Sequence, residues 1–188
     1  MKTRSWSFAL GGSWAHVGVV LLATACWLVG TNRMSAQSAD DVEAAFLFNF
    51  SKFVEWPAKA FADGQAPVTI GFVGKTSLAN VFEQNAKGKN AKGRELLVKR
   101  LDAGAGAESC QIVFIGDASQ VAAVLGAVKG KPVLTVGEGD AFLSAGGMIA
   151  LSRDGSRLVF DINAGAIKAS DLKSDPKIEK AARSVKPG

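Results

Sequence analysis

The chain has 188 residues, with 22 lysines and arginines against 17 acidic residues, one histidine and two cysteines. The histidine, His16, lies near the amino end, so the rest of the chain lacks the residue on which Ser-His-Asp triads, Cys-His pairs and His-ligated zinc depend. Catalysis would have to rest on carboxylates, lysines or hydroxyls, and these form no recognisable constellation. The sequence therefore predicts no enzyme, and no catalytic, cofactor-binding or metal-binding residues.

Residues 1–36 have the pattern of an export signal. Lys2 and Arg4 give a positive start, an uncharged apolar run extends from Val17 to Val29, and small residues lead to a cleavage point at Ser35-Ala36. We therefore predict a cleaved signal peptide over residues 1–36 and a single α/β domain over residues 37–188.

Two other interpretations of this segment stay open. Ala23-Thr24-Ala25-Cys26 loosely resembles the lipobox of a lipoprotein, although alanine stands where leucine is usual and apolar residues continue past the cysteine. A retained membrane anchor is the second alternative, but the apolar run is shorter than the ~20 residues that a span requires. We favour cleavage and export to the periplasm.

Cleavage changes the composition that decides which partners are plausible. The basic residues fall from 22 to 19 with the loss of Lys2, Arg4 and Arg33, whereas all 17 acidic residues remain, so the net charge falls from +5 to +2. The nearest approach to a basic tract is the glycine-punctuated stretch 87–94, which predicts a flexible loop. We expect no nucleic-acid partner. Trp56 becomes the one remaining tryptophan and Cys110 the one remaining cysteine.

The run from Asp40 to Pro57 predicts an amphipathic helix. Asp40 is the predicted N-cap, and Glu43 three residues later completes a capping box. Pro57 disfavours helical backbone at the preceding residue, so the predicted helix ends at Trp56. At about 100° per residue, the apolar arc contains Val42, Ala45, Phe46, Leu47, Phe50, Phe53 and Val54, and the polar arc contains Asp41, Ala44, Ser51, Lys52 and Glu55.

Two residues of this helix lie in the wrong arc. Phe48 lies on the polar side, where a second chain or a second layer of the same domain would cover it. Asn49 lies on the apolar side, where it needs a hydrogen-bond partner from a neighbouring chain or loop. Trp56 is either core filler or an exposed anchor. Phe48, Asn49, Glu55 and Trp56 are the candidate residues for a partner or dimer contact.

After this helix, short apolar runs alternate with helical stretches. Continuous apolar runs are typical of parallel strands covered on both faces. Asp154-Gly155 predicts a hairpin that adds an antiparallel edge. We therefore expect an α/β fold with three α/β/α layers and a mainly parallel, Rossmann-like sheet. The predicted strands are 68–73, 96–101, 112–115, 132–136, 148–151 and 158–162, and the predicted helices are 77–86, 118–128 and a tail from 163 to about 185.

Two glycine-rich stretches resemble nucleotide-binding loops but depart from them. Gly74-Lys75-Thr76 follows a strand, yet Thr69 stands where a phosphate loop requires its first glycine. Gly137-Glu138-Gly139 begins like a dinucleotide fingerprint, but Phe142 replaces its last glycine. Both are better explained as turns after strands.

Cys110 is the redox candidate of the chain. An unpaired cysteine next to a strand is most often an inert, small apolar residue. The alternative is a thiol that cross-links two chains or senses oxidant, which requires exposure and a lowered pKa.

Residues 44–57 strongly resemble the opening helix of the YfiR/HmsC-like family of small periplasmic proteins. The match continues, in the same order, through residues 93–96, 110–115, 133–137, 142–149 and 159–163, and ends with an Ala- and Lys-rich final helix. It covers nearly all of the chain after residue 36.

This resemblance implies a regulatory role. Characterised members bind the periplasmic part of an inner-membrane diguanylate cyclase and hold it inactive, which lowers cyclic di-GMP and biofilm formation. The same domain also looks to be used as a sensory module ahead of membrane sensor kinases. The resemblance implies a homodimer that meets the membrane only through its partner. The best-known members are regulated by disulfides, whereas Cys110 alone cannot form an intrachain switch.

Two other classes of function remain as alternatives. A periplasmic small-molecule-binding sensory protein is possible because α/β sheets place crevices at their strand ends. A hydrolase is the least favoured class, since the exported chain has no histidine.

Overall fold

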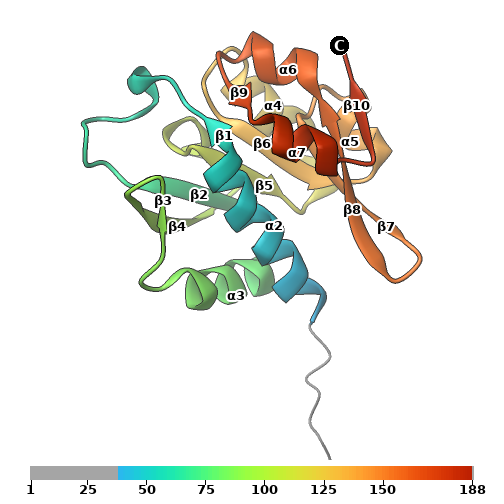
Figure 1. The fold of residues 1–188 in the computed structure, drawn as a ribbon, viewed down its shortest axis with the longest axis horizontal. Coiled ribbons are helices and arrows are strands. Elements are labelled where there is room, and N and C mark those ends of the chain that lie inside the picture. The colour runs from blue at the N-terminus through green and yellow to red at the C-terminus, as the bar shows by residue number, and fades with distance from the viewer. Residues whose placement is uncertain (1–37, 188) are drawn as a thin grey trace, which may run out of the picture. The chain divides into compact units, whose positions relative to one another are not determined.

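The structure, a computed structural model, describes residues 38–187 and contains an eight-stranded, mostly parallel sheet (Figure 1). The spatial order is β10-β8-β7-β6-β5-β2-β4-β3, with β4, β2, β5, β6 and β7 all parallel. Every residue of β2 and β5 is buried, which is why all of their residues except Thr69 are apolar. The strands are β2 (Val68–Val73), β3 (Asn90–Ala91), β4 (Arg94–Leu101), β5 (Ile112–Ile115), β6 (Leu134–Glu138), β7 (Ile149–Asp154), β8 (Arg157–Asn163) and β10 (Ser184–Lys186).

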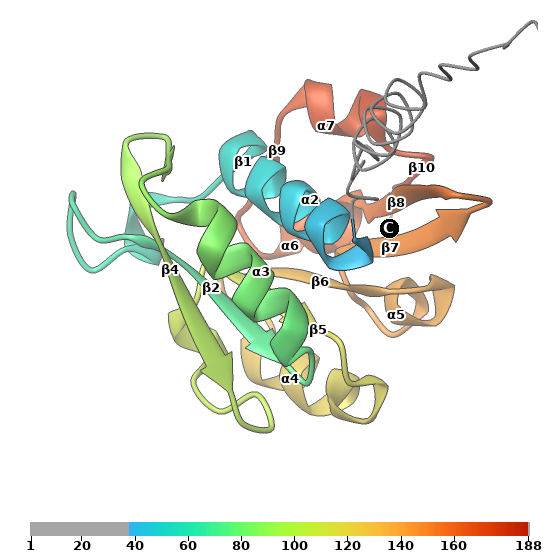
Figure 2. The same ribbon diagram turned by 90° about the horizontal axis from the view of Figure 1, so that it is seen from below.

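Helices cover the sheet and form two hydrophobic cores, so the predicted three-layer α/β/α fold is confirmed (Figure 2). The first core receives side chains from α2 (Ala39–Phe53), α3 (Thr76–Ala86), α6 (Ala164–Ala169) and α7 (Pro176–Ala181). The second receives side chains from α4 (Val121–Val128) and α5 (Asp140–Ser144). Short 3-10 helices η2 (Ala58–Ala60), η3 (Ala107–Ser109) and η4 (Ala118–Gln120) connect these elements, and β1 (Val54–Glu55) pairs with β9 (Lys173–Ser174) in a separate ribbon.

The parallel strands follow the doubly wound order in which the first strand lies between the second and the third. Here β2 lies between β4 and β5, so the direction of winding reverses between β2 and β5. Open α/β sheets place their ligand crevice outside the carboxyl ends of the strands at such a point. In this chain that position is occupied by the turns at Gly74-Lys75 and Gly116-Asp117.

The hairpin of β7 and β8 is present, but it does not form the edge of the sheet. The prediction was wrong here because β10 pairs in parallel with β8 and lies outside it. The predicted tail helix is also wrong. Asp171, with φ at 56°, follows α6, and Pro176 sits at the first turn of α7, so the tail is divided into α6, β9, α7 and β10.

Helix α2 begins and ends earlier than the sequence predicted. Its N-cap is Ser38, whose hydroxyl accepts from the Asp41 backbone N–H at 3.1 Å while the Asp41 carboxylate accepts from the Ser38 N–H. Asp40 therefore lies inside the helix. The helix ends at Phe53 because Val54 and Glu55 take extended backbone and pair with β9.

The buried face of α2 is rotated relative to the predicted apolar arc. It is centred on Leu47 and includes Ala44 and Ser51, which were assigned to the polar arc, whereas Ala45 is exposed. Helix α3 packs beside α2, and small residues allow the two to approach (Figure 2). Ser51 is buried at little cost because its hydroxyl donates to the Phe48 carbonyl at 2.6 Å.

Strand β10 is attached to β8 by a buried carboxylate. Asp161, only 2% exposed, accepts from Arg183 Nε at 3.1 Å, from Arg183 Nη2 and from Ser184 Oγ at 2.7 Å. The hydrogen bonds from Arg183 hold the pKa of Asp161 below its ordinary value, although burial acts in the opposite direction.

We expect this carboxylate to make the fold acid-sensitive. Because its pKa is lower in the folded than in the unfolded chain, its stabilisation is present above the unfolded pKa of about 3.9 and is lost as pH falls through the folded value. Asp161→Asn should destabilise the domain by about 1 kcal/mol at pH 7 and flatten the fall in stability below pH ~4. Urea unfolding of both proteins across pH checks this; parallel pH profiles would contradict it.

Candidate functional site

Phe48 lies half-buried at the side of α2, packed against the first core. The ammonium groups of Lys52 and Lys89 lie 5.4 and 5.3 Å from the centre of its ring. Lys89 precedes β3, so this contact joins α2 to the β3–β4 hairpin by cation–π attraction. Phe48 is therefore covered in part by its own domain, and its remaining surface is framed by positive charge.

Asn49 is exposed on the outer face of α2, between Ala45 and Lys52. The expectation that it lies in a buried arc was wrong, because the buried face turns toward α3. Its amide carries no desolvation cost and is presented to solvent beside a small alanine.

Glu55 and Trp56 follow α2 at the β1–β9 ribbon. The indole Nε1 of Trp56 donates to the Gln111 carbonyl at 3.0 Å, which fixes the ring at the amino end of β5. Glu55 pairs with Lys173 across the ribbon and lies 3.7 Å from the Lys92 ammonium. The structure thus brings these two candidate residues together.

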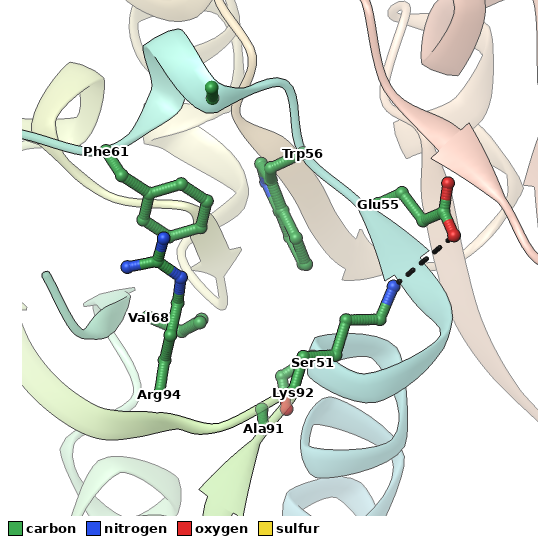
Figure 3. Close-up of a pocket in the computed structure, with 9 residues that line it drawn as sticks. Ser51, Glu55, Trp56, Phe61, Val68, Ala91, Lys92 and Arg94 are labelled. Carbon is green, nitrogen blue, oxygen red and sulfur yellow. Dashed lines mark ion pairs between the residues drawn. The ribbon is translucent and has the colours of Figure 1, made fainter. Parts of the chain in front are cut away.

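A pocket of about 360 Å³ opens beside Trp56 (Figure 3). The indole forms one wall, and opposite it the Arg94 guanidinium stacks on Phe61, with 3.9 Å between the guanidinium carbon and the ring centre. The Glu55–Lys92 pair lies on a third side. The pocket is lined by Ser51, Glu55, Trp56, Ala58, Phe61, Val68, Ala91, Lys92 and Arg94.

Of the residues that build this pocket, only Glu55 and Trp56 were among the candidates predicted from the sequence. Gln111 is buried, and its side-chain amide joins the loop before β2 to the sheet. It accepts from the Thr69 N–H at 2.8 Å and donates to the Ala60 carbonyl at 2.6 Å. Arg94 donates from Nη1 to the Ala66 carbonyl at 2.5 Å. The sequence shows an arginine at the start of β4, but it does not show that Arg94 contacts Phe61 and Ala66, which lie about 30 residues earlier in the chain.

Cys110 is 2% exposed and packs under Gly71, where an added Cβ would lie 3.0 Å from its sulfur. Burial raises the pKa of the Cys110 thiol. Both facts favour the inert alternative, because a redox-active thiol needs exposure and a lowered pKa.

A charged cluster occupies the carboxyl ends of β2 and β6. The Lys75 ammonium lies 2.6 Å from the Glu43 carboxylate, 2.9 Å from Glu138 and 3.9 Å from Asp40. Burial acts to lower the pKa of Lys75, but hydrogen bonds to Glu43 and Glu138 raise it overall. The lysine of the Gly74-Lys75-Thr76 turn is thus bound by carboxylates of its own chain.

Phe142 explains the incomplete dinucleotide fingerprint. Its ring lies on two glycines, since an added Cβ would approach it to 2.5 Å at Gly137 and 2.2 Å at Gly147. The phenyl ring therefore fills the space between strand and helix that a glycine-lined turn would leave open.

In residues 38–187 no helix is long and apolar enough to cross a membrane. Within the same range, no group of three acidic, cysteine or histidine side chains is placed to hold a metal ion.

The model of the YfiR/HmsC-like family matches residues 40–183. The chain belongs to the YfiR/HmsC-like family. The match begins with α2 and runs to Arg183 before β10, which confirms the resemblance found in the sequence. YfiR/HmsC-like membership supports a regulatory role for this protein.

One solved structure with a similar chain is the crystal structure of a conserved domain protein from Vibrio cholerae O1 biovar El Tor. The two chains are 14% identical with a TM-score of 0.48, and the alignment covers 63% of this chain. The aligned part of this chain spans about half of the Vibrio cholerae chain, 55% of its length.

Proposed function

We propose that this protein is a periplasmic regulator that binds the periplasmic part of an inner-membrane diguanylate cyclase and represses it, lowering cyclic di-GMP and biofilm formation. The observation that carries the proposal is the family match over residues 40–183, which includes the whole of α2 after its first residue. Residues 1–36 act as the cleaved export signal in this proposal.

The docking surface in this proposal is the outer side of α2 and the ribbon after it. Asn49 is exposed, Phe48 keeps part of its ring uncovered, and Glu55 and Trp56 border the neighbouring pocket. An exposed amide beside aromatic rings suits a protein interface, where aromatic residues are enriched and polar groups fix orientation. The same surface serves a homodimer or a membrane sensor kinase if either is the cognate partner.

We expect Asn49→Arg to disrupt regulation without unfolding the domain. A long charged side chain placed at the centre of a docking face clashes with the partner, whereas an exposed helical position tolerates arginine within about 0.5 kcal/mol. In cells that lack the gene, cyclic di-GMP should rise. The wild-type gene should restore the low level and Asn49→Arg should not.

Ala127→Arg is the matched control, because Ala127 is exposed on α4, which packs on the other face of the sheet. This variant should restore repression fully. The proposal fails if deleting the gene leaves cyclic di-GMP unchanged.

A second candidate function is binding of a small molecule as a sensory signal. The pocket beside Trp56 favours it, because its volume and its aromatic walls suit a small ligand. A shift in thermal unfolding with amino acids or nucleotides, abolished by filling the pocket with Ala91→Phe, would support this alternative.

A further inference from the structure

Basic side chains gather around the pocket beside Trp56, and together we call them the basic rim. The stretch 87–94, expected to be a flexible loop, instead enters the hairpin of β3 and β4 and carries most of the rim. Within the rim, Lys52 and Lys89 border Phe48, and Lys92 and Arg94 line the pocket. The basic rim comprises Lys52, Lys89, Lys92 and Arg94.

The pocket combines this charge with an apolar floor. Val68 and Ala91 are buried at its base, and the Trp56 ring is held in place by its hydrogen bond to Gln111. A fixed aromatic wall loses little entropy when a ligand side chain packs against it. The Arg94 guanidinium has five donors, and its hydrogen bonds to the described residues all come from Nη1.

Lys92 is held at the mouth of the pocket in a strained backbone conformation. It has φ at 52° and Gly93 has φ at 80°, which makes the two-residue turn between β3 and β4. Such turns favour asparagine and glycine, since positive φ costs a lysine energy. A strained lysine lining a pocket points to a function for its charge.

Glu55 is the one acidic residue among the nine described residues that line the pocket. Its side chain is 64% exposed and that of Lys92 is 43% exposed, so their ion pair at 3.7 Å is weak. A carboxylate from another molecule can therefore replace Glu55 beside Lys92 at little cost.

We propose that the pocket and its basic rim dock an acidic segment of the membrane partner, with one apolar side chain seated against Trp56 and flanking carboxylates bound by Lys92 and Arg94. This inference rests on the proposed function and adds the chemistry of the partner's segment. Lys52 and Lys89 extend the positive surface along Phe48, so the segment runs from the pocket toward α2.

The test uses residues 37–188, because the side chains of both cores lie between Ala44 and Ile178. Trp56 is the one tryptophan in that range, so its fluorescence reports the pocket directly. The probe is a five-residue capped peptide with phenylalanine at its centre and two glutamates on each side. We expect saturable binding that weakens as salt is raised, because the contacts are between exposed charges.

The double variant Lys89→Gln/Lys92→Asn should weaken binding of the peptide about tenfold. Asparagine suits the turn at this position, so the hairpin is kept. The matched control is Lys129→Gln/Lys131→Asn, which removes the same charge at the end of α4 and should bind like the wild type.

Several results would overturn the proposal. One is equal affinity of wild type and the Lys89/Lys92 double variant, and another is equal binding of a peptide with lysines in place of glutamates. Binding of phosphatidylglycerol vesicles in the absence of the peptide would show that the basic rim binds the membrane surface instead. Phenylpropionate binding as tightly as the peptide would assign the pocket to a small molecule. If the double variant loses the peptide but still represses the cyclase in cells, this inference fails while the proposed function stands.

Discussion

Replacing Lys75 by methionine is expected to lower the free energy of unfolding by about 3–5 kcal/mol, because it leaves a buried carboxylate without its partner. The Glu43 side chain is 6% exposed and lies 2.6 Å from the Lys75 ammonium. Methionine fills a similar volume but cannot compensate that charge. Urea denaturation at pH 7 measures the loss.

Two further variants separate charge from packing. Lys75→Met/Glu43→Gln removes both charges and should recover part of the loss, since a neutral amide is cheaper to bury. Lys59→Met removes an ion pair with Asp171 whose side chains are 63% and 62% exposed, and it should cost under about 1 kcal/mol. Equal effects of Lys75→Met and Lys59→Met would show that Glu43 is reached by water.

Gly147→Ala is expected to destabilise the domain by about 1–3 kcal/mol through overpacking. The added methyl group would lie 2.2 Å from the Phe142 ring, which is itself confined by Gly137 on its other side. Since the ring cannot move away from one glycine without approaching the other, strain must be taken up by α5. Thermal or urea unfolding checks the prediction.

The control for this experiment is Gly126→Ala on α4, where an added Cβ meets nothing within 4 Å. Alanine favours helical backbone over glycine, so this variant should be about 0.5–1 kcal/mol more stable than wild type. Adding Phe142→Leu to Gly147→Ala should relieve the clash. If the double variant loses as much unfolding free energy as the two single variants lose together, the ring is not the source of the strain.

The central strands could be predicted because their signal is local, whereas the short strands β1, β3, β9 and β10 were missed. Residues 68–73 and 112–115 are apolar except for Thr69 and form β2 and β5 with the predicted bounds. The buried face of α2 could not be predicted from periodicity, since α3 packs beside the helix and Ser51 is buried with its hydroxyl bonded to the Phe48 carbonyl. The N-cap was misplaced because Ser38-Asp41 and Asp40-Glu43 give equally good cap patterns, and only the first is formed.

The candidate site was predicted in part. Trp56 and Glu55 were chosen for their position at the end of the helix, and both border the pocket. Gln111 carries no local signal, because its hydrogen bonds reach Thr69 and Ala60, which lie more than 40 residues away in sequence. Lys92 was not chosen, because residues 87–94 were predicted to form a flexible loop. A composition of lysine and glycine does not show that the backbone turns back into a hairpin.

The ribbon of β1 and β9 ties the first helix to the last fifth of the chain. Val54 pairs with Ser174, and the Asp175 N–H donates to the Phe53 carbonyl at 2.8 Å. The end of α2 therefore lacks its partner until residues 173–175 have left the ribosome, and contacts so distant in sequence delay folding. For a protein that we propose is exported, slow pairing of these two segments would leave more time for the chain to cross the membrane before it folds.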